Sequence, residues 1–169
     1  MKLIVEQTYP WSITEVAAML TDVSFVRWRA EHVTGTGTVS QAEVDHDDAG
    51  GVTIMVRRTL PTDLIPAQVR AIIGDSVEVR QAEVWVAPAG ERIDGTAAAE
   101  IVGVPIRIHG TVALESLPDG GTRKTYSGEI QATIPLFAQV VEQAVEKTLR
   151  RTLAREEAAG REWLARKAN

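Results

Sequence analysis

The sequence predicts an α+β fold, in which an antiparallel sheet is covered by one long C-terminal helix. Its predicted elements run strand, two short helices, six strands and a final helix, without the βαβ alternation typical of parallel sheets. In the last strand, apolar residues such as Tyr126 and Ile130 alternate with polar ones such as Ser127 and Glu129, as expected for a sheet with one wet face. The terminal helix is the only predicted element long enough to cross such a sheet.

The N-terminal elements are predicted from local signals. Residues 3–9 are mostly aliphatic and end at Pro10, which indicates a strand. Ser12 is a suitable N-cap, and Glu15 three positions later completes a capping box. Asp22 is placed to cap a second helix. The two short helices are expected at residues 13–20 and 23–33.

Alternating hydrophobicity predicts the strands of the middle region, at residues 38–44, 52–60, 77–86, 93–101 and 106–114. In the third of these, the apolar positions change from odd (Val77, Val79) to even (Val84, Val86). This change predicts a bulge near Gln81 or a strand that passes from one wall to another. The turn 118–121 (Pro-Asp-Gly-Gly) predicts a hairpin to the last strand.

Two further helices are predicted outside this region. Residues 62–74 do not alternate, and Pro66 with the helical spacing of Val69, Ile72 and Ile73 predicts a short amphipathic helix between strands three and four. The last helix is expected from Leu136 to about residue 166. Its expected buried stripe is Phe137, Val140, Val141, Ala144, Val145, Thr148, Leu149, Thr152, Leu153, Trp163 and Leu164, with charged residues, Glu156 among them, mostly outside it.

Length and composition narrow the classes of function. The 169 residues suit a single domain over 1–169, and the absence of cysteine excludes disulfides and thiolate metal sites. A net charge of −5 argues against nucleic-acid binding, which needs a basic face. No apolar run is long enough for a membrane span, and an acid at Glu6 does not fit a signal peptide, so we expect no stable membrane insertion and a cytoplasmic location.

Three segments carry a resemblance to a known superfamily. They are the opening 9–22 (Tyr-Pro-Trp-Ser-Ile-Thr-Glu-Val onward), the stretch with Gly103-Val104-Pro105, Gly110, Gly121-Thr122 and Gly128, and the end with Ile134-Pro135-Leu136, Val140, Val145, Glu157, Trp163 and Leu164. They resemble the helix-grip superfamily of START lipid-transfer, birch-pollen-allergen-like and polyketide cyclase/dehydrase-like proteins. Within it, the chain is most similar to an uncharacterised bacterial family with no assigned activity. The helix near Pro66 departs from the minimal pattern of the superfamily.

The resemblance implies a curved sheet wrapped around the long helix, with a ligand cavity between them. The inward positions of the late strands are small, namely Gly95, Ala97, Ala99, Gly110, Gly128 and Ala132. Small residues there either permit strand curvature and close helix approach or open a pocket, and the resemblance favours the pocket. The predicted pocket residues are Trp28, Val56, Arg58, Trp85, Ala97, Ala99, Gly110, Tyr126, Val141 and Val145. A lid or plug is expected at Ile65, Val69 and Ile72.

Arg58 is the most informative single position, because it shares its parity with Val56 and so points toward the apolar face. A buried unpaired charge is costly, so Arg58 needs water or a partner. It either snorkels to solvent at the strand end or contacts an anionic group such as a carboxylate. Glu100 or Asp94 are further possible partners, although both lie on the opposite parity from Ala97 and Ala99.

No motif indicates catalysis, a metal or a cofactor. The three histidines are scattered, with His32 on a helix, His46 in an acidic turn and His109 on the polar face of a strand. The acidic turn 45–48 lacks the loop spacing of a calcium-binding hand. Nucleophile elbows, phosphate loops and dinucleotide fingerprints do not occur. We therefore predict no catalytic residue, no metal and no cofactor.

Three functions remain open. The first is binding or carriage of a small hydrophobic molecule such as a lipid, fatty acid, isoprenoid or polyketide, with Arg58 or Tyr126 orienting its polar end. The second is a cyclase/dehydratase- or hydrolase-type enzyme using the same pocket, for which Glu100, Asp94, Tyr126 and His32 are the candidates. The third is a ligand-free protein-interaction module. The protein is expected to be a monomer or a weak homodimer, the latter through Leu64 and Ile65.

Overall fold

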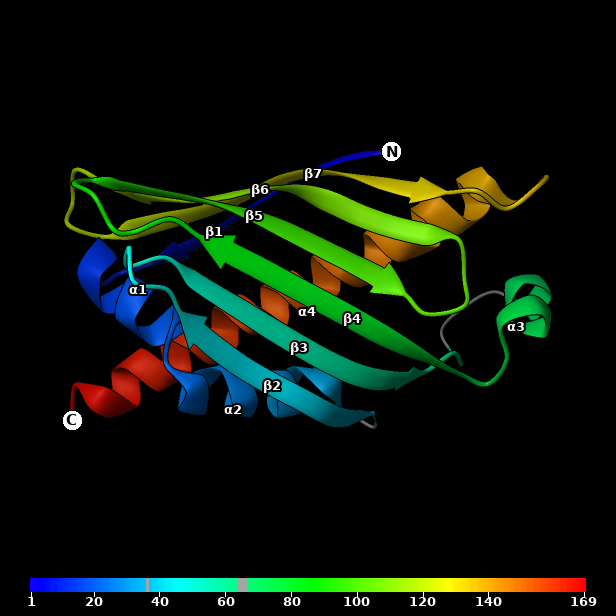
Figure 1. The fold of residues 1–169 in the computed structure, drawn as a ribbon, viewed down its shortest axis with the longest axis horizontal. Coiled ribbons are helices and arrows are strands. Elements are labelled where there is room, and N and C mark those ends of the chain that lie inside the picture. Colours follow the sequence, from blue (N-terminus) through cyan, green and yellow to red (C-terminus); the bar gives the residue numbers. More distant parts are fainter. Residues whose placement is uncertain (36, 64–66) are drawn as a thin grey trace.

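The computed structural model describes residues 1–35, 37–63 and 67–169, and shows a twisted sheet crossed on one face by a long helix (Figure 1). Its elements are β1 (Lys2–Tyr9), α1 (Ile13–Leu20), α2 (Val23–Thr34), β2 (Thr38–His46), β3 (Val52–Pro61), α3 (Ala67–Ile73), β4 (Ser76–Trp85), β5 (Arg92–Ile101), β6 (Ile106–Ser116), β7 (Thr122–Ala132) and α4 (Ala138–Lys167). The predicted order of elements is confirmed, including the short helix between β3 and β4.

The seven strands form one sheet in the order β1-β7-β6-β5-β4-β3-β2, and all neighbours are antiparallel. β1 pairs with the last strand, so the six later strands form a meander that β1 completes at one edge. α4 crosses the sheet diagonally and packs against β1, β7 and α2 (Figure 1). None of the helices in the described part of the chain combines the length and hydrophobicity that a membrane crossing requires.

The N-terminal helices begin where the capping signals predict. The Ser12 hydroxyl accepts a hydrogen bond from the Glu15 backbone N–H, and the Glu15 carboxylate accepts one from the Ser12 N–H at 3.0 Å. The Asp22 carboxylate accepts the Ser24 N–H at 2.8 Å and starts α2. Both caps satisfy amide donors that lack partners within the helix.

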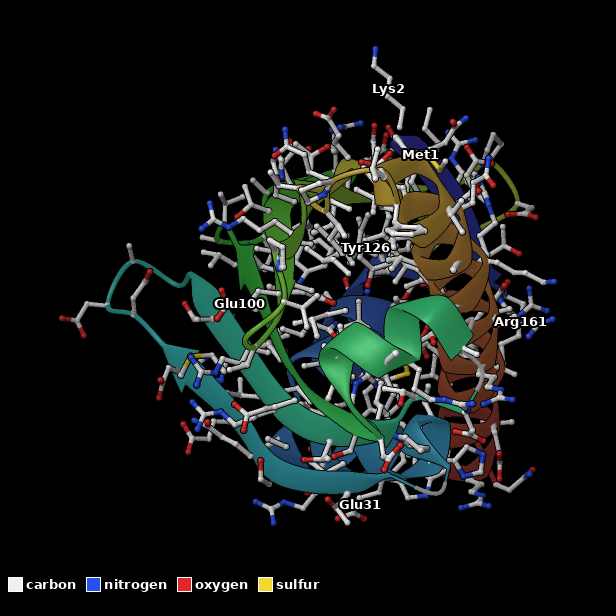
Figure 2. All side chains as sticks on the ribbon, turned by 90° about the vertical axis from the view of Figure 1, so that its right-hand side faces the viewer. Met1, Lys2, Glu31, Glu100, Tyr126 and Arg161 are labelled. Carbon is white, nitrogen blue, oxygen red and sulfur yellow. The ribbon has the colours of Figure 1, made fainter. Side chains whose placement is uncertain are left out.

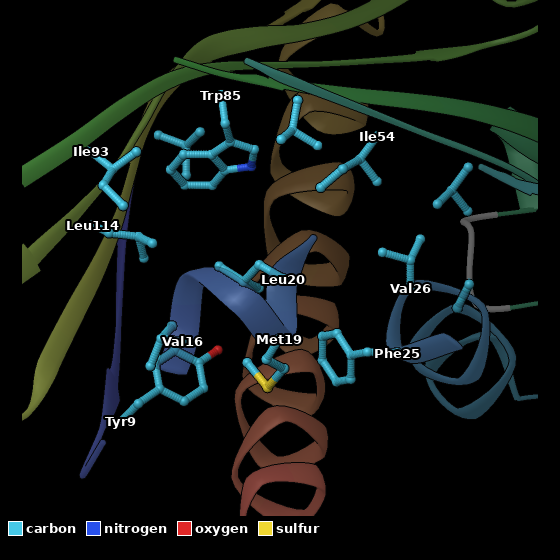
Figure 3. Close-up of a cluster of buried hydrophobic side chains, with 14 of the residues drawn as sticks. Tyr9, Val16, Met19, Leu20, Phe25, Val26, Ile54, Trp85, Ile93 and Leu114 are labelled. Atoms are coloured by element: carbon cyan, nitrogen blue, oxygen red, sulfur yellow. The ribbon is translucent and has the colours of Figure 1, made fainter. Parts of the chain in front are cut away.

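The hydrophobic interior consists of two separate clusters. The larger one joins α1, α2 and the C-terminal half of α4 to the ends of β3–β7, with Val16, Phe25, Trp85 and Leu114 among its members (Figure 3). The smaller one lies near the start of α4 and contains Ile106, Ala132, Ile134 and Val141. Between these clusters the sheet continues without an equally packed apolar layer.

The register of β4 corrects one prediction. β4 pairs with β3 without interruption from Ser76 to Trp85, so the expected bulge near Gln81 is absent. Val84 is 47% exposed and Val86 is 56% exposed, because they lie on the outer face. Gln81 and Glu83 keep the inward positions instead. The irregularity of the sheet lies in β2, between Val39 and Gln41.

The buried stripe of α4 also differs from the prediction. Val140 and Thr148 are exposed, whereas Glu156 is buried and 5% exposed. Gly160 is buried too, and a Cβ placed there would lie 2.8 Å from Tyr9 Cε1, so this glycine lets α4 approach β1 closely.

Candidate functional site

The concave face of the sheet between the two hydrophobic clusters is partly open to solvent. Its inward positions follow one another across the strands: Val56 pairs with Gln81, Gln81 with Ala99, and Ala99 with Ile108. Gln81, Ala99 and Ile108 are only half-buried, and so are Val145 and Leu149 of α4, which lie at the margins of the two clusters. A fully packed interior would cover these apolar groups, so this part of the core is incomplete.

Arg58 lies on the same face, one pleat further along β3, and it is 7% exposed. Its Nη2 donates to Gln81 Oε1 at 3.3 Å. Its Nε has no hydrogen-bond partner among the described residues. Burial lowers the pKa of Arg58, which the charge of Glu156 opposes and that of Arg29 reinforces.

Beside this open face lies a buried ionic cluster, formed by Glu83 on β4 and by Lys124 and Tyr126 on β7. The Tyr126 hydroxyl donates to Glu83 Oε1 at 2.9 Å, and Trp85 Nε1 donates to Oε2 at 3.2 Å. Lys124 Nζ lies 3.7 Å from Glu83 Oε2 and 4.5 Å from the centre of the Tyr126 ring. Figure 2 shows Tyr126 inside the molecule, between the sheet and α4.

The cluster perturbs the ionisation of each of its members. Burial by itself would raise the pKa of Glu83, but Lys124 and Arg29, with the hydrogen bonds from Tyr126 and Trp85, outweigh it and lower the pKa to about 2. Burial lowers the pKa of Lys124, which the charge of Glu83 opposes. Burial and then Glu83 raise the pKa of the Tyr126 hydroxyl. The carboxylate is therefore held ionised and the phenol protonated at neutral pH.

A second buried ion pair joins the helices. Arg29 Nη1 on α2 lies 3.6 Å from Glu156 Oε2 on α4, and both side chains are 5% exposed. Gln7 on β1 donates from Nε2 to the Leu153 carbonyl at 2.6 Å, which ties the same part of α4 to the sheet. These contacts hold the C-terminal half of α4 against α2 and β1.

The structure places most of the predicted pocket residues on the inward side. The buried ones are Val56, Arg58, Trp85, Tyr126 and Val141, and the half-buried ones are Ala97, Ala99, Gly110 and Val145. Trp28 instead stacks on His32, with ring centroids 4.9 Å apart, and packs against Phe25 and Trp163 where α2 meets α4. Of the predicted lid, Ile65 lies outside the described residues, as do the side chains of Val69 and Ile72.

The inward glycines have a structural cause. A Cβ at Gly110 would lie 2.4 Å from the Gly128 Cα and 2.3 Å from the Ser127 carbonyl oxygen. A Cβ at Gly128 would lie 2.6 Å from the His109 carbonyl oxygen. Glycine is therefore needed for the close approach of β6 and β7, which supports the curvature interpretation at these two positions.

Glu100 and Asp94 are not partners of Arg58. Both lie on the outer face, where Glu100 pairs with Arg80 at 3.5 Å and Asp94 with Arg92 at 2.9 Å. Glu100 projects from the outer side of the sheet in Figure 2. This outer position also removes both from the candidate acids of an internal pocket, because the sheet separates them from it.

Two hollows lie beside these features. One, of about 490 Å³, is bounded by α1, the β2–β3 and β4–β5 turns and the inward side chains of Trp85, Ile93 and Leu114. The other, of about 520 Å³, is lined mainly by outward side chains of β3–β6, with Ala82 and Ala98 as its small residues and Arg57, Arg80, Glu100 and Arg107 as its charged ones. It is also bordered by Val56, Gln81, Ala99 and Ile108, which hold the inward positions of their strands. Trp85 links the first hollow to the ionic cluster, since its indole N–H is bound to Glu83.

Sequence reasoning missed Glu83, Lys124, Arg29 and Glu156. The first two had a usable signal, because the inward parity of Trp85 continues to Glu83 and that of Tyr126 continues to Lys124. That signal was obscured by the apolar residues Val84 and Val86 on the opposite parity. The Arg29–Glu156 pair had none, since it depends on how two distant helices meet.

Comparison with known proteins matches nearly the whole chain. The family model described as "Protein of unknown function (DUF2505)" covers residues 5–164. The uncharacterized protein Rv0481c of Mycobacterium tuberculosis is 26% identical over 161 residues, which are 92% of each chain. The relative's description assigns no activity, so this match concerns sequence and length alone.

Solved structures share the fold. Ara h 8.0201 matches with a TM-score of 0.50 and 15% identity over 94% of this chain and 97% of its own. Dicamba monooxygenase, bound to 3,6-dichlorosalicylic acid, matches with a TM-score of 0.59 and 12% identity over 99% of this chain and 50% of its own. The expected helix-grip fold is thereby confirmed, whereas such low identities carry no information on activity.

Proposed function

The chain belongs to the DUF2505 family of proteins of unknown function. From the packing of its interior, we propose that the protein binds a small hydrophobic molecule between the sheet and α4. One observation carries this proposal. The apolar residues Ala99 and Ile108 on the sheet are half-buried and belong to neither packed cluster. Val145 and Leu149 on α4 are half-buried too and lie at the margins of the smaller and the larger cluster, where a complete core would bury them.

Two physical arguments support this assignment. Covering apolar surface releases about 25 cal/mol per Å², so a molecule that completes the core gains affinity without any new fold element. Sites for small molecules are mostly apolar with a few placed polar groups, and here Gln81 and Arg58 supply those groups. A protein that contains this fold, dicamba monooxygenase, holds a small organic molecule in its solved structure.

A second candidate function is an enzyme of the cyclase or dehydratase type. It is favoured because the side chains of Glu83, Lys124 and Tyr126 lie close together. The pKa values of all three groups depart from their ordinary values, as is common at catalytic sites. Tyr126 donates to Glu83, Lys124 Nζ lies 3.7 Å from the same carboxylate, and the side chains of Glu83 and Lys124 are each 1% exposed. These buried contacts favour a structural role for the cluster. Chemical change of an extracted ligand during incubation with the protein would favour the enzyme.

The test is native mass spectrometry of the purified protein, followed by organic extraction and titration with the extracted compound or with dodecanoate. We expect the variant Ala99→Leu, which fills the concave face, to weaken binding at least tenfold. Its control is Ala98→Leu on the adjacent outward position, which should bind as the wild type does.

Equal binding by the wild type and Ala99→Leu would contradict a site on the concave face. Loss of binding in Ala98→Leu alone would move the site to the outer hollow, which Ala98 lines.

A further inference from the structure

We propose that the molecule bound on the concave face is an anionic amphiphile, such as a fatty acid, whose carboxylate pairs with Arg58. This inference rests on the proposed function and names the class of its ligand. Its basis is the distribution of buried charge rather than the apolar surface.

Among the described residues, three cations are buried, Arg29, Arg58 and Lys124, against two carboxylates, Glu83 and Glu156. Each carboxylate has its own cation, at 3.6 Å for Arg29–Glu156 and 3.7 Å for Lys124–Glu83. Arg58 is the cation left over, since no carboxylate of the described residues lies within 4.0 Å of it and its hydrogen bond, at 3.3 Å, goes to the neutral amide of Gln81. The interior therefore has an excess of one formal positive charge, in a protein with a net charge of −5.

The missing counterion is not hidden in the undescribed part of the chain. Residues 36 and 64–66, and the side chains at 34, 68, 69 and 72, include no aspartate or glutamate. Glu100 and Asp94, which the sequence offers as possible partners of Arg58, form ion pairs with other arginines on the outer face of the sheet. An anion that completes the charge balance must therefore come from outside the chain.

Arg58 is suited to hold such an anion. A guanidinium presents several N–H donors in one plane and binds a carboxylate through two parallel hydrogen bonds. Only its Nη2 donates to Gln81, and its Nε is buried without a hydrogen-bond partner in the part of the chain that the structure describes. Since Arg58 lies one pleat from the half-buried Gln81 and Ala99, a carboxylate at Arg58 would leave its alkyl chain against the open apolar face.

The test compares two probes of equal chain length, dodecanoate and 1-dodecanol, by calorimetric titration of the full chain. We expect the wild type to bind dodecanoate at least tenfold more tightly than 1-dodecanol. Arg58→Met should remove this preference and leave the affinity for 1-dodecanol unchanged. Arg57→Met is the matched control, because Arg57 is the neighbouring residue of β3 on the outer face, paired with Glu78, and should keep the preference.

The outcomes separate this inference from the proposed function. If the wild type binds both probes equally, or if Arg58→Met keeps the preference, the anionic ligand is excluded and the hydrophobic site stands. If the wild type binds neither probe, the proposed function fails together with the inference. Arg58→Gln, which keeps a polar side chain, gives the same comparison in case the methionine variant does not fold.

Discussion

Lys124 and Glu83 face each other across the inside of the sheet, although β5 and β6 separate their strands. Their Nζ and Oε2 atoms lie 3.7 Å apart, and each side chain is 1% exposed. The strands can curve enough for this contact because Gly110 and Gly128 let β6 and β7 approach each other closely. The pair thus joins two distant strands inside the larger hydrophobic cluster.

The first prediction concerns this ion pair. Lys124→Met should lower the free energy of unfolding by about 3–5 kcal/mol, because it leaves a buried carboxylate without a counterion. Glu83→Gln/Lys124→Met should be more stable than Lys124→Met alone, since the uncompensated charge is gone and Tyr126 keeps an acceptor. Urea unfolding measures both, with Lys147→Met on the exposed side of α4 as the control. A loss below about 1 kcal/mol would show that the pair contributes little.

The second prediction is an acid-dependent loss of stability. The pKa of Glu83 is about 2 in the folded protein and 4.5 ordinarily, so the folded state favours the ionised form. The stabilisation that the ionised Glu83 gives the folded state is complete above pH 4.5 and is lost as the pH falls toward 2. It amounts to roughly 3 kcal/mol at 1.36 kcal/mol for each pKa unit.

Urea unfolding of the wild type between pH 5 and pH 2 should therefore show a steeper decline than that of Glu83→Gln. The pKa values of three acids nearer the surface, Glu15, Asp22 and Glu115, are also lowered. The difference between the two curves separates the contribution of Glu83 from theirs. Parallel curves would mean that Glu83 has an ordinary pKa.

The third prediction concerns the contact between α4 and β1. Gly160→Val should lower the free energy of unfolding by about 1–3 kcal/mol, because its side chain must displace the Tyr9 ring at 2.8 Å and the Met19 methyl at 3.1 Å. Ala158→Val, on the exposed side of the same helix, controls for the helix propensity of valine. Thermal unfolding compares the two, and equal melting temperatures would contradict the close contact.

The fourth prediction concerns the start of α1. Ser12→Ala removes the hydroxyl that accepts the Glu15 N–H and should cost about 1 kcal/mol. Thr14→Ala, at an exposed position within α1, should not lower the stability. Chemical denaturation distinguishes them. Similar values for the two variants would show that the capping box does not stabilise this helix.

Much of the fold was predictable because its signals are local. The Ser12 capping box, the Asp22 cap and the alternation from Tyr126 to Ile130 each depend on residues close together in sequence. These signals give the boundaries of most elements to within a few residues. At the end of β4, hydrophobicity alone marks the apolar residues Val84 and Val86 as inward, although both point outward. It therefore misses the polar residues Gln81 and Glu83, which point inward.

The candidate site was only partly predictable. Parity with Val56 predicts that Arg58 faces inward, and the structure buries it there with 7% exposure. The alternative that Arg58 reaches solvent at the strand end is therefore wrong. The outward position of Glu100 and Asp94 follows from their opposite parity to Ala97 and Ala99. That no other carboxylate of the described residues pairs with Arg58 could not be derived, because it depends on how distant elements pack. The partners of Glu83 and Glu156 likewise lie on elements that are far away in sequence.

The sequence by itself determined the elements, their order and the inward face of most strands, since hydrophobic periodicity and capping act over a few residues. Only the tertiary structure decided which charges become neighbours, because Arg29 meets Glu156 and Lys124 meets Glu83 through the packing of α2 on α4 and the curvature of the sheet. In an interior without water, these long-range contacts decide which buried charges are neutralised by an opposite charge. For that reason Arg58 has no counterion among the described residues, and no local pattern in β3 encodes this.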